Sequence, residues 1–114
     1  MNENDEVRLR HMLAAAREAI TFAANETRES LAKNRVLVLA LVKEIEIIGE
    51  AASKVSDDCR TENSQIPWRD IIDMRNYLIH AYFNVDLDQV WSTLQNDLPP
   101  LLTELEKIIA ADSE

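Results

Sequence analysis

Apolar residues recur at steps of three and four near the start of the chain. They form one continuous stripe along a helix: Leu9, Met12, Leu13, Ala16, Ile20 and Ala23. Asn4 or Asp5 can cap the first turn, and Glu6 suits the positive end of the helix dipole. The pattern predicts a helix over roughly residues 5–25, followed by a polar segment at 27–33 with room for one short helical turn.

The run from Val36 to Val42 has no polar side and is rich in β-branched residues, so a strand is the competing interpretation. The positions that follow favour a helix over residues 34–56, because charged and apolar side chains alternate there at helical spacing. The charged ones, which we expect to form a solvated face, are Glu44, Glu46, Glu50 and Lys54. A helix that is apolar on every side is usually buried on every side. We therefore expect its first half to pack in a bundle with one flank and against a second subunit with the other.

Residues 57–65 are polar without periodicity, which predicts the main loop, with Cys59 as an incidental thiol in it. Pro67 then suits the first turn of a helix. The helix ends near residues 83–84 and carries an apolar set formed by Ile71, Ile72, Leu78 and Ile79.

Two further helices are predicted from their first turns. Asp86, with Gln89 three residues on, resembles a capping box. Asp97 can cap the last helix, which carries Pro99 and Pro100 in its first turn.

Composition agrees with helices throughout. The chain has 114 residues with one glycine and three prolines, too few turn residues for an antiparallel β protein of this size. We therefore predict an all-α fold, a bundle of four to five helices that forms a single domain over residues 1–114. The longest apolar run is too short to span a bilayer and the acidic N-terminus does not resemble a leader, which favours a cytoplasmic protein that does not enter membranes. Cys59 is the only cysteine, so a disulfide within the chain is impossible and a Cys-based metal site is disfavoured.

The formal net charge is −9. An acidic field repels phosphate backbones, which excludes a protein that grips nucleic acid through a broad basic surface. It leaves open a small phosphate site built from one or two arginines, and it also suits a basic partner.

The helix after Pro67 gathers residue types that suit metal-independent phosphodiester chemistry: Arg75, Asn76, His80 and Tyr82. A neutral histidine can take a proton from a 2′-hydroxyl or return one to a leaving oxygen near neutral pH. An arginine can direct two N–H groups to a phosphate and stabilise the charge that grows in the transition state. Asn76 could orient the imidazole, and Tyr82 could position a substrate or be modified itself. These residues make a catalytic site without metal or cofactor the hypothesis to test.

Helical geometry separates the four residues. Arg75 and Tyr82 share a face if the helix continues, as do Asn76 and His80, which are four apart. Arg75 and His80 are about 140° apart around an ideal helix, so they diverge unless the helix breaks near His80 or Arg75 reaches round. An alternative is a composite site to which two subunits each contribute. A purely structural role also stays open, because a lone Arg-x4-His match is common in helical proteins and a cation is favoured at a helix C-terminus.

Several segments stand in a fixed order along the chain. The first is residues 9–19, and the second is residues 47–55, which contain Ile-Gly-Glu-Ala-Ala. The third is residues 66–72, which begin with Ile-Pro-Trp, and the fourth is the Arg-x4-His-x-Tyr motif at 75–82. Leu-Pro-Pro-Leu follows at 98–101. In these segments the chain resembles the HepT-like branch of the HEPN superfamily, the toxin half of HepT/MntA-type modules. The resemblance covers nearly the whole chain.

The resemblance implies an all-α homodimer whose two motifs face each other across a cleft. It implies a metal-independent endoribonuclease, the toxin of a type VII-like toxin–antitoxin module, that cleaves an RNA such as tRNA or mRNA by 2′-hydroxyl attack. Arg75 and His80 would be the catalytic pair and Asn76 the supporting polar residue. Tyr82 would be the residue to which a cognate MntA-type nucleotidyltransferase antitoxin attaches AMP, which would exclude RNA phosphate by charge and bulk. The alternative is a non-catalytic helical dimer that binds a nucleotidyltransferase or a nucleotide.

Overall fold

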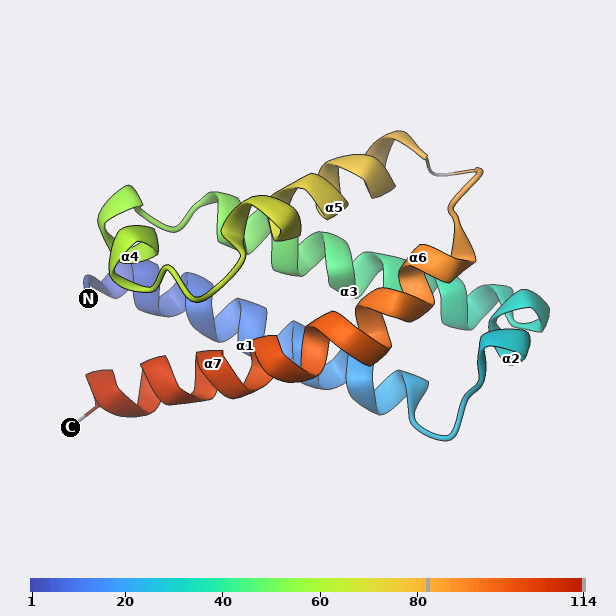
Figure 1. The fold of residues 1–114 in the computed structure, drawn as a ribbon, viewed down its shortest axis with the longest axis horizontal. Coiled ribbons are helices and arrows are strands. Elements are labelled where there is room, and N and C mark those ends of the chain that lie inside the picture. Colours follow the sequence, from blue (N-terminus) through green and yellow to red (C-terminus); the bar gives the residue numbers. More distant parts are fainter. Residues whose placement is uncertain (82, 114) are drawn as a thin grey trace.

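The computed structural model describes residues 1–81 and 83–113, and every element in that part of the chain is helical. Four long helices form the bundle: α1 (Glu3–Ala23), α3 (Arg35–Ser53), α5 (Trp68–His80) and α7 (Leu98–Asp112). Three short helices connect them, α2 (Arg28–Lys33), α4 (Asp57–Glu62) and α6 (Leu87–Ser92), and a π-helical segment, η1 (Thr93–Asp97), joins α6 to α7. The predicted all-α bundle is confirmed (Figure 1).

The long helices pack in the order α5, α3, α1, α7. The most extensive contacts are between α1 and α3, with α5 packed on α3 and α7 packed on α1. Figure 1 shows α5 and α7 on opposite sides of this central pair. The apolar stripe predicted for α1 supplies much of the core, since Leu9, Met12 and Ala16 are fully buried.

The start of α1 differs from the prediction. The cap is Asn2, whose side chain accepts a hydrogen bond of 2.7 Å from the Asp5 N–H, so the expected caps Asn4 and Asp5 are wrong. Asp5 is instead buried, and its carboxylate accepts bonds from the Ser56 N–H at 2.8 Å and the Ser56 hydroxyl at 2.6 Å. Asp5 therefore ties the start of α1 to the start of α4.

The run that allowed a strand is helical. Asn34 caps α3 by accepting from the Leu37 N–H at 3.0 Å. Leu41 is fully buried, whereas Val36 is 77% and Leu39 52% exposed. The outer flank of α3 is thus apolar and open to solvent in a single chain.

The predicted loop at residues 57–65 is partly wrong, because residues 57–62 form α4. The Ser56 hydroxyl caps this helix by accepting from the Cys59 N–H at 3.2 Å. Cys59 is buried rather than an incidental loop thiol, and burial raises the pKa of its thiol. A six-residue helix has too little periodicity to stand out in the sequence.

The side-chain cap predicted at Asp97 is also absent. Asp97 has a helical backbone and makes no side-chain capping bond, so the chain runs from α6 through η1 into α7 without leaving helical geometry. The Leu98 N–H donates to the carbonyl of Thr93, five residues back. Pro99 and Pro100 have no N–H to donate. A π-helical turn directly before them shifts the hydrogen-bond pattern and lets the helix pass through the two prolines.

No helix in residues 1–81 and 83–113 combines the length and the apolar character that crossing a membrane requires.

Candidate active site

Both ends of α5, the helix that carries the motif, are held in place. At its start Ile66 and Trp68 are buried, and the indole N–H of Trp68 donates to the Asn63 carbonyl at 3.1 Å. At its end the Ala81 N–H bonds to the Tyr77 carbonyl, and the Tyr77 hydroxyl accepts from the Asp86 N–H at 2.9 Å. The Ile-Pro-Trp lead-in and the residues before α6 therefore fix where the motif lies.

α5 ends at His80, not near residues 83–84 as predicted. Ala81 leaves the helix, and the Asn84 N–H bonds back to its carbonyl, which makes a turn. Tyr82 lies outside the described residues. Its predicted face-sharing with Arg75 needed a helix longer than α5, and its predicted modification stays a prediction.

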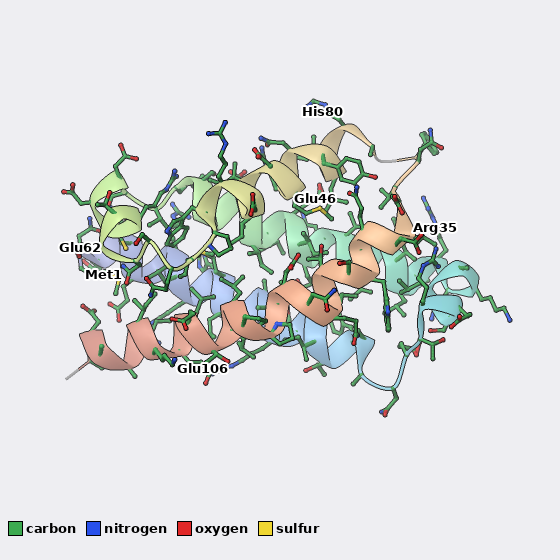
Figure 2. The ribbon with its side chains drawn as sticks, viewed as in Figure 1. Met1, Arg35, Glu46, Glu62, His80 and Glu106 are labelled. Carbon is green, nitrogen blue, oxygen red and sulfur yellow. The ribbon has the colours of Figure 1, made fainter. Side chains whose placement is uncertain are left out.

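His80 is the last residue of α5 and is exposed. Figure 2 shows its side chain at the edge of the molecule, directed away from the bundle. Within residues 1–81 and 83–113 its imidazole makes no hydrogen bond or ion pair. Its imidazole is therefore accessible to a ligand or to a second chain.

Arg75 is held by two acceptors. Its Nη2 donates to Glu50 Oε2 at 2.7 Å, and its Nη1 donates to Asn76 Oδ1 at 2.8 Å. The other oxygen of Glu50 pairs with the ammonium of Lys54 at 3.3 Å. The bond to Lys54 and then the Arg75 charge hold the pKa of the Glu50 carboxyl below its usual value. The Arg75 side chain is 30% exposed, and the bond from its Nη1 to Asn76 lies at the surface.

Gly49 explains how Arg75 comes to lie beside Glu50. A Cβ atom added at Gly49 would lie 2.2 Å from the Arg75 Cβ and 3.1 Å from the Ile71 carbonyl oxygen. Such distances are impossible without movement of the helix, so only glycine permits this approach of α3 and α5. The Gly-Glu pair on α3 thus sets both the crossing point and the partner of Arg75.

The structure gives Asn76 a contact that the sequence did not predict. The sequence suggested that Asn76 orients the imidazole of His80, but its oxygen accepts from Arg75. Asn76 shares a helix face with His80, but the described residues show no contact between Arg75 and His80, so their convergence stays a prediction. Sequence reasoning missed Glu50, which it placed on a solvated face, although the pairing of Glu50 with Lys54 at i and i+4 was visible in the sequence.

Next to the motif, a pocket of about 510 Å³ lies between α3, the end of α5 and residues 83–87. Leu39, Ile79 and Phe83 line it with apolar surface, and each of them is substantially exposed. Arg35 and Lys43 add positive charge at this pocket, and Glu46 adds a negative charge.

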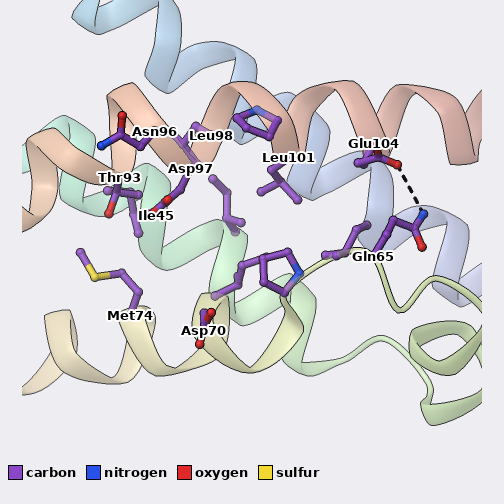
Figure 3. A pocket seen from close by; sticks show the side chains of 15 residues that line it. Ile45, Gln65, Asp70, Met74, Thr93, Asn96, Asp97, Leu98, Leu101 and Glu104 are labelled. Atoms are coloured by element: carbon purple, nitrogen blue, oxygen red, sulfur yellow. Dashed lines mark hydrogen bonds between the residues drawn. The ribbon is translucent and has the colours of Figure 1, made fainter.

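A second pocket, of about 430 Å³, lies on the other side of α5, against η1 and α7 (Figure 3). Its walls are mainly apolar, and Asp70 and Asp97 approach it from α5 and η1. Desolvation and then the Asp70 charge raise the pKa of the Asp97 carboxyl. Neither Arg75 nor His80 lines either of the two pockets.

Comparison with known proteins agrees with the family that the sequence resembles. The family described as "Ribonuclease HepT-like" matches residues 12–108. "Putative RNase MJ1216" of Methanocaldococcus jannaschii is 38% identical over 92 residues, which cover 81% of this chain and 76% of the relative. "Putative RNase TTE0752" of Caldanaerobacter subterraneus is 34% identical over 101 residues, 89% of this chain and 90% of the relative. "Probable ribonuclease HepT" of Thermococcus cleftensis is 42% identical over 69 residues, 60% of this chain and 63% of the relative.

No solved structure gives a significant match. The matched range nevertheless holds every long helix except the start of α1 and the end of α7, and it includes the Arg75–His80 motif and the Gly49–Glu50 pair. The chain belongs to the HepT-like ribonuclease family of the HEPN superfamily.

Proposed function

We propose that this protein is an endoribonuclease that cleaves RNA through Arg75 and His80. The observation that carries the proposal is the arrangement on α5: an arginine held by two acceptors next to the helix face that ends in an exposed histidine. Membership of the HepT-like family, whose relatives carry ribonuclease names, supports RNA as the substrate.

The proposed reaction assigns one task to each residue. The neutral imidazole of His80 removes the proton from a 2′-hydroxyl, and the 2′-oxygen attacks the adjacent phosphorus. The bond from phosphorus to the 5′-oxygen breaks, and that oxygen receives a proton from an imidazolium. The products are a 2′,3′-cyclic phosphate and a 5′-hydroxyl. Free N–H groups of Arg75 stabilise the negative charge that builds on the phosphate oxygens in the transition state.

We propose that the working unit is a homodimer built on the apolar surface next to the motif. Val36, Leu39, Ile79 and Phe83 expose large apolar side chains on neighbouring parts of α3, α5 and the turn that follows. Pairing two such surfaces would remove them from water and bring two copies of His80 close together. A monomer at micromolar concentration in light scattering would contradict this arrangement.

The test of catalysis is RNA cleavage by the purified, unmodified protein in EDTA. We expect His80→Ala and Arg75→Ala each to lower the rate by about a hundredfold or more. Arg17→Ala, which removes an exposed arginine from α1, is the matched control and should cleave like the wild type. Equal cleavage by all four proteins would show a contaminating nuclease and defeat the assignment.

We further propose that the protein is a toxin silenced when a cognate MntA-type nucleotidyltransferase attaches AMP to Tyr82. The chain has two tyrosines, which provides an internal control. Incubation with the partner and ATP should add the mass of AMP to the wild type and to Tyr77→Phe but not to Tyr82→Phe. A stable complex with neither AMP addition nor RNA cleavage would favour the non-catalytic binding module, the alternative that the net charge of −9 keeps open.

A further inference from the structure

The ion pair between Glu50 and Arg75 joins the two helices that cross at Gly49. Its 2.7 Å contact has the length of a charge-assisted hydrogen bond. Arg75 is also held by Asn76 at 2.8 Å, so both terminal nitrogens of its guanidinium have a fixed acceptor. Two anchors on a planar group define the orientation of its plane as well as its place.

The hydrogen bonds to Glu50 and Asn76 do not use all the N–H donors of Arg75. A guanidinium has five N–H donors, and two of them are used by Glu50 and Asn76. The remaining donors belong to a side chain that is 30% exposed. Arg75 can therefore bind a phosphate without giving up either anchor.

The charges around Glu50 show that it does not cancel the positive charge of the site. Lys54 pairs with one carboxylate oxygen and Arg75 with the other, so two cations share one anion and a net positive charge remains. If Glu50 served to shield Arg75 from RNA, we would expect it to pair with Arg75 alone and not with Lys54 as well. The arrangement favours orientation of Arg75 over its inhibition.

We infer that Glu50 is a positioning residue, which fixes the guanidinium of Arg75 for contact with the scissile phosphate. The inference rests on the proposed ribonuclease activity. Because Glu50 acts through Arg75, its loss should lower kcat, since a freely rotating guanidinium is seldom aligned with the transition state. The loss of a negative charge should at the same time favour RNA binding, so KM should not rise.

The kinetic test compares two substitutions at one position. We expect Glu50→Ala to lower kcat about tenfold with KM equal or lower. Glu50→Gln keeps an acceptor oxygen for Arg75 and should recover most of the loss. An unchanged kcat, or a higher kcat/KM as expected for an inhibitory carboxylate, overturns the inference.

Glu106→Ala is the matched control. It removes one negative charge and one ion pair with an arginine, that between Glu106 and Arg17 at 3.9 Å, from the side of the molecule opposite His80 (Figure 2). We expect its kcat and KM to equal those of the wild type. Thermal unfolding of each variant identifies any loss of kcat that comes from unfolding.

A readout that needs no cleavage separates this inference from the proposed function. In the wild type, restricted rotation of the Arg75 guanidinium should give distinct NMR signals for its two terminal nitrogens, assigned by their absence in Arg75→Lys. In Glu50→Ala we expect these signals to merge. Equal mobility in both proteins overturns the inference whether or not RNA is cleaved. Restriction in the wild type together with a lack of RNA cleavage supports the role of Glu50 and overturns the proposed function alone.

Discussion

Glu44 lies in the interface between α1 and α3 and gives the fold a dependence on pH. It is only 6% exposed, and its Oε2 atom is buried without a hydrogen-bond partner in the described part of the chain. Burial, then a hydrogen bond with Glu18 and then the Glu18 charge raise the pKa of Glu44 from 4.5 to about 7. The sequence placed this residue on a solvated face, so its burial is a correction.

The direction of the effect follows from proton binding. Between pH 4.5 and about 7 the folded protein keeps a proton on Glu44 that the unfolded chain has lost. Stability therefore falls as the pH rises through this window. A shift from 4.5 to about 7 corresponds to about 3 kcal/mol once Glu44 is fully ionised.

Glu44→Gln replaces the protonated carboxyl by a neutral group of the same shape. We expect it to match the wild type in free energy of unfolding near pH 4 and to exceed it by about 3 kcal/mol at pH 8. Denaturant unfolding at fixed protein concentration, followed by tryptophan fluorescence and repeated across this range, measures the difference. Glu18→Gln should give a smaller gain, because burial, the larger cause, remains. A difference that does not change with pH would refute the reasoning.

Two further predictions concern contacts between helices. Gly49→Ala should destabilise the fold by about 2–3 kcal/mol and lower RNA cleavage beyond the loss of folded protein, because the new Cβ must push α5 and Arg75 away from α3. Thermal unfolding and cleavage rates measure the two effects. Ser53→Ala, which changes an exposed residue of the same helix, is the control. A Gly49→Ala protein that is as stable and as active as the wild type would contradict the close contact between α3 and α5. Asp5→Ala should cost about 3 kcal/mol in denaturant unfolding, because the Ser56 N–H and hydroxyl both lose their acceptor, whereas Glu3→Ala in the same turn should cost little. An equal effect of both substitutions would show that the buried bonds do not matter.

Local periodicity was sufficient to predict the long helices. In α1 the stripe containing Leu9 and Met12 is an unbroken helical repeat, and both residues are fully buried. In α3 the positions after Val42 excluded a strand, because a strand would place alternate residues on one face. The short helix α4 and the π turn of η1 were missed, since one depends on six residues and the other on hydrogen bonding around two prolines.

The site could be predicted only where its residues are neighbours in sequence. Arg75, Asn76 and His80 share one helix and form a motif. Glu50 is 25 residues from Arg75, and nothing in the local pattern distinguishes it from Glu44 and Glu46 of the same helix. The burial of Glu44 likewise depends on how α1 lies across α3, which is a property of the bundle.

The attachment of α5 has a consequence for how the protein opens. Among the long helices, α5 packs extensively on α3 alone, and the 430 Å³ pocket separates it from η1 and α7. Its amide protons should therefore exchange with deuterium through local detachment, ahead of those of α1 and α3, which exchange when the whole chain unfolds. The helix that carries Arg75 and His80 would then be a separate cooperative unit, which packs on the rest of the bundle mainly through α3. Substitutions in the α1–α7 interface could accumulate without disturbing the motif, whereas small changes along the α3–α5 contact would reach it directly.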